Sequence, residues 1–403
     1  MPSTPPEGEP APTDGSLPEA ALAGLAARRL SVYVHVPFCA VRCGYCDFNT
    51  YTAAELGAAP GSSQDAYLAA ARAELDLAAR VLTDAPPLHS VFFGGGTPTM
   101  LPAAELAGLL TAVGDRFGFA ADAEITTEAN PESVDRAYLD TLVAAGFTRL
   151  SLGMQSARPG VLAVLDRRHT PGRVPQVVRW AREAGFSSVS VDLIYGSPTE
   201  TLADWDASLD AAIGLEPDHV SAYSLIVEPG TRLAARIGRG ELPGIDDDAQ
   251  ADCYNLAEDR LVAAGYHAYE VSNWSHPGHE SRHNLAYWLG QDWWGVGPGA
   301  HSHVNGVRWW NVRHPRTYSA ALAAGTSPAQ AREVLEASDR RVERVMLELR
   351  LDSGLPLDVL TDSELRRVPA LVASGLAVQD NGRLQVTLRG RLLADAVIRD
   401  LLD

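Results

Sequence analysis

Short β-branched or aromatic runs alternate with longer Ala- and Leu-rich stretches from residue 30 onward, and this alternation limits the chain to few folds. The pattern predicts repeated βα units around a parallel sheet. Glycines end two of the expected helices, at Gly146 in VAAGF and Gly185 in REAGF. The candidate strands are residues 31–36, 90–93, 124–128, 149–153, 188–194 and 220–227. Six units fit an open doubly wound sheet or a partial barrel, and both place function at the carboxyl ends of the strands.

The segments outside these units have other patterns. Residues 1–28 are rich in proline and acids, so we expect a disordered tail before a core of residues 29–235. Residues 236–326 lose the alternation and form a His- and Trp-rich linking region. Residues 327–403 combine helices with two strands joined by an Asn-Gly turn, which predicts a winged-helix-like α+β module. This module has 11 Arg and 13 acidic residues, so we expect packing or partner docking rather than DNA binding.

Charge and composition exclude several classes of protein. The chain has 33 basic and 51 acidic residues, a net charge of −18, which argues against nucleic acid or anionic lipid as the main ligand. It has no lysine, so Schiff-base enzymes and P-loop nucleotidases are excluded. No stretch approaches the roughly eighteen apolar residues of a membrane span, and four cysteines do not make a disulfide framework. We therefore predict a cytoplasmic protein with no integral membrane segment.

Histidine and tryptophan are concentrated in residues 266–318, which hold seven of the 11 His and six of the eight Trp residues. This composition leaves two interpretations open. The first is an aromatic packing layer, and the second is a site for a flat, apolar, metal-bearing ligand.

The strongest chemical signal is HVPFCAVRCGYCDF, in which Cys39, Cys43 and Cys46 follow the first strand at C-x3-C-x2-C spacing. Three thiolates on one loop suit an iron–sulfur cluster that leaves one iron without a protein ligand. A structural zinc site would need four closed ligands, and the remaining cysteine, Cys253, lies far along the chain on a predicted helix. The spacing therefore favours a cluster, with Cys253 as a small core residue.

This loop resembles that of the radical S-adenosylmethionine (SAM) superfamily, whose members hold a [4Fe-4S] cluster with its open iron chelated by SAM. The resemblance implies a partial (βα)6 barrel and reductive cleavage of SAM to a 5′-deoxyadenosyl radical, chemistry that belongs to the cofactor. Tyr45 occupies the aromatic place beside the cluster. Gly94, Gly95, Gly96 and Thr97 of FFGGGTPT stand where the superfamily's glycine motif meets the amino group of SAM.

Further polar residues at strand ends match cofactor-binding positions of the oxygen-independent coproporphyrinogen III oxidase family. These positions are Tyr33, Glu128, Gln155, Arg167 and Asp192. Each alone could also be a helix cap, a structural ion pair or a barrel hydrogen bond. The resemblance covers roughly residues 31–400 and implies SAM at the barrel mouth, with no catalytic side chain supplied by the protein.

Three features separate this chain from the oxidases of that family. Phe48 stands where the oxidases have a further cysteine, and the low-complexity tail replaces their ordered N-terminal extension. The run His283-Asn284-Leu285-Ala286-Tyr287-Trp288 matches the HNxxYW signature of the heme-chaperone branch, the HemW-type proteins. The resemblance to this branch implies heme as a further ligand, with heme-accepting respiratory proteins and an electron donor for the cluster as partners.

Within that signature, His283 is the expected heme-binding residue, with Tyr287 and Trp288 in the apolar wall of the site. On a helix, positions 283 and 287 share a face. In an alternative interpretation His283 and Asn284 hydrogen-bond the linking region to the barrel, and another histidine ligates heme; the candidates are His276, His279, His301 and His303. The alternative function is an oxygen-independent coproporphyrinogen III oxidase.

Overall fold

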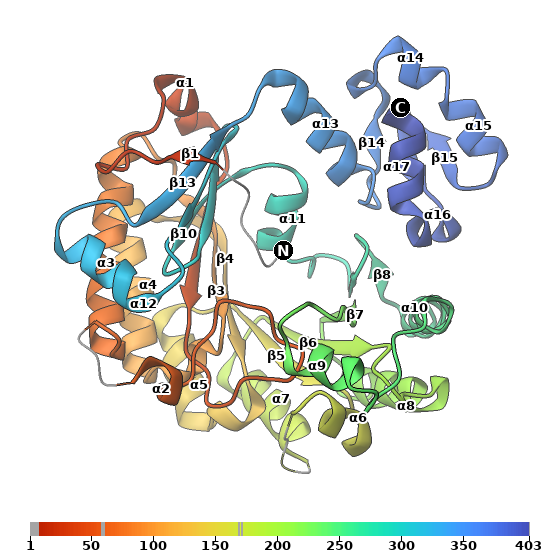
Figure 1. Ribbon diagram of the computed structural model, residues 1–403, viewed down its shortest axis with the longest axis horizontal. Helices are drawn as coiled ribbons and strands as arrows, with labels where there is room; N and C mark the ends of the chain where they lie inside the picture. The colour runs from red at the N-terminus through yellow and green to blue at the C-terminus, as the bar shows by residue number, and fades with distance from the viewer. Residues whose placement is uncertain (1–7, 58–60, 168–169, 171, 403) are drawn as a thin grey trace.

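One mixed sheet dominates the computed structural model, which describes residues 8–57, 61–167, 170 and 172–402 (Figure 1). Its centre is a run of six neighbouring parallel strands in sequence order. They are β2 (Leu30–Val36), β3 (Leu88–Gly95), β4 (Phe119–Ala129), β5 (Arg149–Gln155), β6 (Ser188–Tyr195) and β7 (His219–Ser224). These correspond to the six predicted strands, and the α/β fold class with a partial (βα)6 barrel is confirmed.

Helices connect these strands. The main crossover helices are α3 (Gln64–Val81), α4 (Ala103–Phe117), α5 (Arg136–Ala145), α7 (Arg173–Ala184) and α8 (Leu202–Ile213), with the shorter α2 (Ala53–Leu56) and α6 (Pro159–Val164). Their ends follow from local chemistry, since Thr201 closes a capping box at α8. Gly146 and Gly185 end α5 and α7 in the left-handed conformation, as the sequence predicted. No helix in the described ranges is long and apolar enough to cross a membrane.

Residue character alternates along the barrel strands. In β6, Val189 and Val191 are completely buried in the main core, whereas Ser190 and Asp192 line the barrel interior. Because successive side chains of a strand point to opposite faces, the apolar face packs on the helices and the polar face surrounds a cavity.

The predicted linking region, residues 236–326, extends this sheet at both edges. After α9 (Arg232–Gly238) and α10 (Asp247–Ala263), β8 (His267–Ala268) and β9 (Asn273–Ser275) add to β7. After α11 (Arg282–Trp288), β10 (Asp292–Val296) pairs in parallel with β2, followed outward by β11 (His301–Val304) and β12 (Val307–Asn311), then α12 (Pro315–Ala323) and β13 (Ala329–Val334). Trp274, Trp294, Trp309 and Trp310 are buried here, so most of the aromatic concentration is a packing layer.

The expectation of a disordered tail is wrong for residues 8–28. The segment forms β1 (Glu9–Pro10), which pairs with β13, then α1 (Glu19–Leu22) and η1 (Leu25–Ala27). Leu25 is 3% exposed, and Arg28 Nε lies 2.6 Å from Asp292 Oδ2 in an ion pair. The open edge of β13 and the buried Asp292 order this segment, and composition alone cannot reveal partners so distant in sequence. Residues 1–7 lie outside the described residues.

The chain ends in a separate lobe with its own core, at the upper right of Figure 1. Its elements are α13 (Ala337–Glu348), β14 (Leu355–Pro356), η4 (Leu357–Val359), α14 (Asp362–Leu365), α15 (Val368–Ala373), β15 (Ala377–Asp380), β16 (Arg383–Val386), α16 (Leu388–Leu392) and α17 (Ala394–Leu402). Asn381 and Gly382, both at positive φ, join β15 to β16 as the sequence predicted. The predicted α+β module is thus present, although β13 belongs to the main sheet.

Candidate functional site

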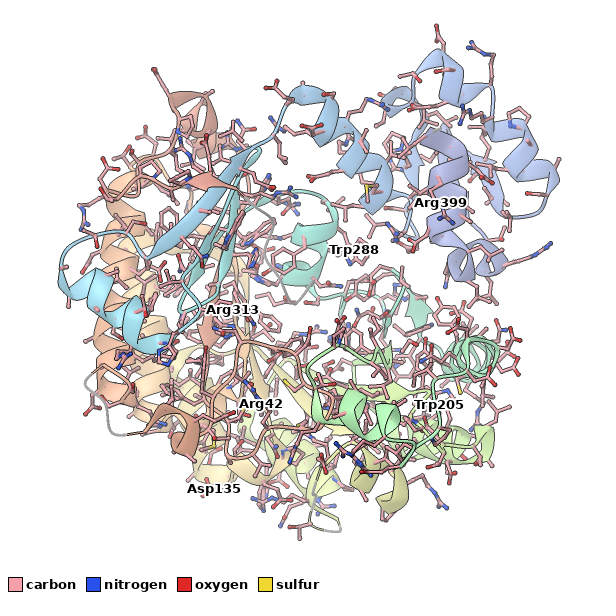
Figure 2. The ribbon with its side chains drawn as sticks, in the orientation of Figure 1. Arg42, Asp135, Trp205, Trp288, Arg313 and Arg399 are labelled. Carbon is pink, nitrogen blue, oxygen red and sulfur yellow. The ribbon has the colours of Figure 1, made fainter. Side chains whose placement is uncertain are left out.

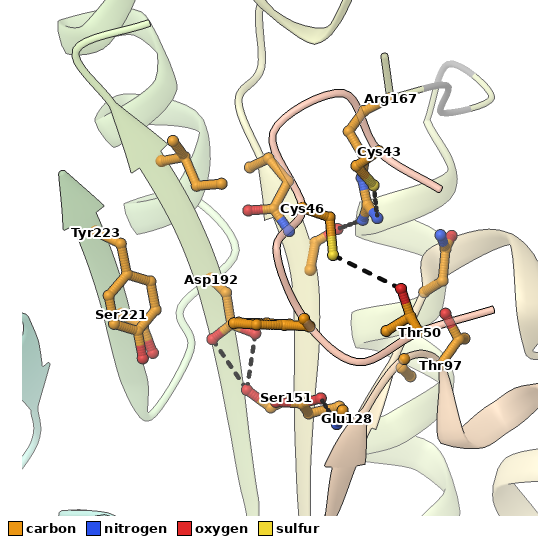
Figure 3. Close-up of a pocket in the computed structure, with 18 of the residues that line it drawn as sticks. Cys43, Cys46, Thr50, Thr97, Glu128, Ser151, Arg167, Asp192, Ser221 and Tyr223 are labelled. Atoms are coloured by element: carbon orange, nitrogen blue, oxygen red, sulfur yellow. Dashed lines mark hydrogen bonds between the residues drawn. The ribbon is translucent and has the colours of Figure 1, made fainter. Parts of the chain in front are cut away.

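The carboxyl ends of the barrel strands surround a cavity of about 1200 Å³, shown in part in Figure 3. Most of the predicted site residues line it. They are Tyr33, Cys39, Cys43, Tyr45, Cys46, Gly95, Gly96, Thr97, Glu128, Gln155, Arg167, Asp192 and His283. Gly94 lies just behind this lining, where an added Cβ would come within 3.1 Å of Glu128 Oε2.

The cluster loop, residues 37–51, carries three free thiols after β2. Cys39 N donates to Tyr51 O at 3.0 Å, and Cys46 N donates to Cys43 O at 3.3 Å, so backbone bonds close the loop. Burial raises the pKa of Cys39 to about 11 and also raises the pKa of Cys46. Buried thiolates therefore need positive charge nearby, which iron would supply.

Three free thiols on one loop are one ligand short of the closed four-ligand set of a structural zinc site. In a cubane cluster each thiolate binds a different iron, so three thiolates would leave one iron open. Cys253 stands apart on α10 with a 6% exposed side chain, and its carbonyl accepts a hydrogen bond from Trp205 Nε1 at 2.9 Å (Trp205 is labelled in Figure 2).

The glycine turn after β3 packs directly on the cluster loop. An added Cβ at Gly96 would lie 2.7 Å from Phe38 O and 3.1 Å from Cys39 Sγ. Gly95 has φ +107°, and its N–H donates to Glu128 Oε2 at 3.1 Å. Only glycine allows this approach, so the turn places its backbone against both the thiols and the cavity.

Two half-buried residues with carboxyl groups, Glu128 and Asp192, line the cavity (Figure 3). Burial, and secondarily the charge of Asp192, raises the pKa of Glu128 to about 8. Burial also raises the pKa of Asp192, although Ser151 Oγ donates to both of its oxygens at 2.9 Å. Two carboxyl groups held this way favour a cationic ligand, because a cation would stabilise both ionised forms.

The side chains of Gln155 and Arg167 both lie close to Gly153, near the cluster loop. Gln155 has φ +65°, after an irregularity in the pairing of β5 with β6. Arg167 Nη2 donates to Gly153 O at 3.1 Å, and Arg167 Nη1 lies 3.4 Å from Cys43 Sγ. A non-glycine residue in the left-handed region is uncommon. At Gln155 this backbone conformation occurs in a residue whose side chain lines the cavity.

His283 of the HNxxYW motif lies on α11, which also ends in Trp288 (Figure 2). Ser90 Oγ already donates to Ser31 Oγ, so His283 Nδ1–H donates to Ser90 at 2.9 Å. His283 Nε2 then accepts from Tyr287 O–H at 2.9 Å. Burial lowers the pKa of His283 to about 3, so the ring is neutral, and both of its nitrogens have hydrogen-bond partners.

The other histidines considered for heme do not line this cavity. His276 stacks on Tyr266, and His303 Nδ1 bonds to a backbone carbonyl. Asn284 Nδ2 donates to the Tyr269 hydroxyl oxygen at 3.3 Å, a contact within residues 236–326. Of the two residues that the alternative interpretation expected to join this region to the barrel, His283 does so through Ser90 of β3. The described structure therefore brings His283, and none of those four histidines, to the predicted cofactor site.

Several lining residues were missed by the sequence analysis. They are Thr50, Phe92, Arg149, Ser151, Ser190, His219 and Ser221. Most sit at alternate positions of strands whose other residues are apolar, as in SVSVD and HVSAY. A parallel strand buried on both faces is almost continuously apolar, so this polar alternation was the available signal for a hollow interior.

Comparison with known families agrees with this geometry. The Radical SAM superfamily model matches residues 33–212, and the HemN C-terminal domain model matches residues 335–393. The structure of coproporphyrinogen III oxidase (HemN) from Escherichia coli, a radical SAM enzyme, superposes with a TM-score of 0.81 at 26% identity, covering 96% of this chain and 94% of that one. Fold and site thus define a radical SAM protein with a HemN-type C-terminal lobe.

Sequence relatives identify the family to which this radical SAM protein belongs. The chain is 54% identical over 381 residues to the heme chaperone HemW of Mycobacterium tuberculosis, covering 94% of this chain and 97% of the relative. It is 34% identical to HemW of Escherichia coli, covering 92% and 97%. The chain belongs to the heme chaperone HemW family.

Proposed function

We propose that this protein is a cytoplasmic heme chaperone that holds a [4Fe-4S] cluster and SAM and delivers heme to respiratory hemoproteins. Its family membership supports the heme activity. The observation that carries the proposal is the single cavity that joins the three cysteines, the glycine turn and His283. An external electron donor would reduce the cluster.

The residues present fit both cofactors. Cys39, Cys43 and Cys46 would hold the cluster, and the carboxyl groups of Glu128 and Asp192 that line the cavity suit the ammonium and sulfonium charges of SAM. When bound, the pair supplies reductive cleavage of SAM to a 5′-deoxyadenosyl radical. The protein's part is to position SAM and to limit access of water.

The cluster assignment is tested by anaerobic reconstitution of Cys→Ser variants. Cys39→Ser, Cys43→Ser and Cys46→Ser should each lose most of the bound iron and sulfide. Cys253→Ser is the matched control and should keep the iron and sulfide content of the parent, because Cys253 is a buried residue of α10 in the hydrophobic core. Parent iron content in Cys43→Ser would refute the assignment.

The SAM site is tested by affinity measurements on Asp192→Ala and Glu128→Ala. Loss of a hydrogen bond to a charged group costs about 1.5–3 kcal/mol, so binding should weaken roughly tenfold or more with the cluster intact. Asp204→Ala is a control, because Asp204 caps α8 and lies outside the cavity lining. Parent affinity in Asp192→Ala would remove that residue from the site.

Heme ligation is tested at His283 and Tyr287 together. If His283 Nε2 ligates heme iron, it must exchange the Tyr287 hydroxyl for the metal. His283→Ala should then shift the heme absorption band and speed heme loss to apomyoglobin. Tyr287→Phe should retain heme at least as well as the parent, because the competing hydroxyl is gone. Unchanged spectra and retention in His283→Ala would leave this histidine with a structural role.

The similarity to the HemN structure supports one second candidate function, which is oxidative decarboxylation of coproporphyrinogen III. Phe48, 58% exposed at the cavity, stands at the position that the family resemblance gives to a further cysteine in those oxidases. Supplying reconstituted protein separately with coproporphyrinogen III and with heme distinguishes the two. We expect retained heme absorbance and no decarboxylated product.

A further inference from the structure

Each of the three cysteine sulfurs has at least one polar side chain beside it, and the Thr50 hydroxyl also interacts with the Cys39 sulfur. The pairs are Thr97 Oγ1 with Cys39 Sγ at 3.8 Å, Arg167 Nη1 with Cys43 Sγ at 3.4 Å, and Thr50 Oγ1 with Cys46 Sγ at 3.9 Å. Figure 3 shows the contacts of Thr50 and Arg167. Thr97 and Arg167 occupy positions that the family resemblance assigns to SAM. Thr50 has no such assignment, so the role of its hydroxyl is open.

The backbone around Thr50 is fixed without help from that hydroxyl. Thr50 is 0% exposed, its N–H donates within the loop at 2.7 Å, and its carbonyl accepts from Arg42. The preceding Asn49 donates to the carbonyls of Pro298 and Arg313 at 2.9 and 2.8 Å. The β-branched side chain has few rotamers, so the hydroxyl is held against the sulfur.

The direction of this hydrogen bond follows from the chemistry of a cluster ligand. A cysteine bound to iron is a thiolate and has no proton to donate. In its contact with Cys46 Sγ, the Thr50 hydroxyl can then act only as the donor. Donors to the sulfurs are one of the features that set the reduction potential of an iron–sulfur cluster.

We propose that Thr50 is a redox-tuning residue whose hydrogen bond to the Cys46 sulfur raises the reduction potential of the bound cluster. The proposal rests on the cluster assigned above. Reduction adds one electron to [4Fe-4S]2+ and gives [4Fe-4S]+, with no bond formed or broken, and a low-potential one-electron donor supplies it. The added negative charge spreads onto the thiolates, so a donor to sulfur stabilises the reduced form more than the oxidised form.

The test uses the full chain, reconstituted anaerobically, with dithionite as the reductant. Thr50→Val keeps the shape and removes the donor, whereas Thr50→Ser keeps the donor. The electron paramagnetic resonance signal of the reduced cluster is followed against applied potential. At a fixed potential near the parent midpoint, Thr50→Val should lower the ratio of reduced to oxidised cluster about tenfold, a shift of about 59 mV for one electron.

Two controls accompany this measurement. Thr50→Ser should keep the parent midpoint. Thr99→Val removes another buried hydroxyl, one that contacts Ser133 Oγ and no sulfur, and it should also leave the midpoint unchanged. Bound iron and sulfide are measured in every variant, so a change in potential is separated from a loss of cluster.

A Thr50→Val variant with full iron content and the parent midpoint would overturn the proposal. If Thr50→Val loses its iron, Thr50→Ala is measured in the same way. Loss of iron from both variants also overturns it, because Thr50 would then serve only to shape the loop. A parent protein that binds no cluster would instead refute the proposed function itself.

Discussion

Thr199 has a backbone conformation that its own side chain disfavours. It is exposed and has φ +70°, in the turn between β6 and α8. A β-branched residue in the left-handed region costs roughly 1–2 kcal/mol, while glycine adds about 0.4–1 kcal/mol of backbone entropy to the unfolded chain. We therefore expect Thr199→Gly to stabilise the protein by about 0.5–1 kcal/mol in urea denaturation.

The control for this prediction is Thr111→Gly. Thr111 is also exposed but lies inside α4, where its hydroxyl donates to Ala107 O. Glycine in a helix interior is destabilising, so the same substitution should lower stability by a few tenths to about 1 kcal/mol. A Thr199→Gly variant that loses as much stability as Thr111→Gly would contradict the prediction.

Glu200, the next residue, makes stability depend on pH. Burial raises its pKa from 4.5 to about 7, and among the described residues its Oε1 has no hydrogen-bond partner. The folded state therefore keeps a proton that the unfolded state releases between pH 4.5 and 7. Stability should fall as pH rises through this window and level off above it.

Glu200→Gln tests this dependence, because its amide stays neutral and its oxygen can still accept from Ser197 N. As the pH rises from 4.5 to 7, the free energy of unfolding of the parent should fall relative to that of Glu200→Gln. Its size should be on the order of 1–2 kcal/mol, after allowance for partial exposure of the side chain. A constant difference across this range would argue against the buried proton.

At this scale, the sequence predicts residues whose chemistry depends on spacing along one loop. Cys39, Cys43 and Cys46 are of this kind. Arg149 is not, because its role depends on Glu124 of the neighbouring strand, 3.7 Å away, and on His279 O, 2.8 Å away. The contact of Thr50 with Cys46 likewise depends on how the loop closes, and spacing alone does not determine that.

At the scale of elements, α11 is held to the barrel by a buried carboxylate. Glu124 Oε1 accepts from His283 N at 3.1 Å, and Glu124 pairs with Arg149, whose side chain is 3% exposed. Removing one partner of a buried ion pair costs about 3–5 kcal/mol, because the other charge is left uncompensated. We expect Glu124→Ala to destabilise the protein by about 3 kcal/mol and to speed amide exchange in α11.

Asp122→Ala is the matched control for this prediction. Asp122 pairs with Arg282 of α11 at 2.8 Å, but the Asp122 side chain is 69% exposed. Exposed pairs contribute about 0–1 kcal/mol, so this variant should show little change in stability or in exchange of α11. Equal effects in the two variants would mean that α11 is held mainly by packing.

The sequence predicts elements well where local signals repeat. Strand-like runs and the helix-ending glycines Gly146 and Gly185 mark the βα units. Pairing between distant segments is different: β10 lies beside β2, and β1 lies beside β13. No local pattern specifies such partners, which explains why residues 8–28 were expected to be disordered and why residues 236–326 were not recognised as strands of the same sheet.

At the scale of the whole molecule, polar contacts join two separate hydrophobic cores, and Leu388 of the lobe packs against the barrel core. The C-terminal lobe packs around residues that include Val345, Leu349 and Leu384, and the barrel has its own core. Between them, Asp352 N donates to Tyr269 O at 3.1 Å. The Tyr269 hydroxyl also accepts from Asn284 at the start of α11. The lobe therefore contacts the same residue that supports the helix of the HNxxYW motif.

Besides the ion pair of Arg308 on β12 with Glu343 on α13 at 2.6 Å, the lobe has an ionic contact with the barrel that is made by Arg391. Its Nη1 lies 3.3 Å from Glu258 Oε2 on α10, with both side chains less than one-fifth exposed at 19% and 16%, and Glu258 also accepts from Trp274 Nε1 at 2.7 Å. Arg391→Ala would leave a partly buried carboxylate with one fewer partner. The lobe should remain folded on its own core while its attachment weakens.

Hydrogen exchange measures this attachment directly. In Arg391→Ala, the Asp352 amide should exchange about tenfold faster, equivalent to about 1.4 kcal/mol, while amides within β16 keep their parent rates because they belong to the lobe's own sheet. Arg389→Ala is the control on the same helix, since Arg389 bonds only to Ser374 O inside the lobe among the contacts described. If both variants protect Asp352 as well as the parent does, the lobe is held instead by its other contacts, which include Leu388 against the barrel core and the ion pair of Arg308 with Glu343.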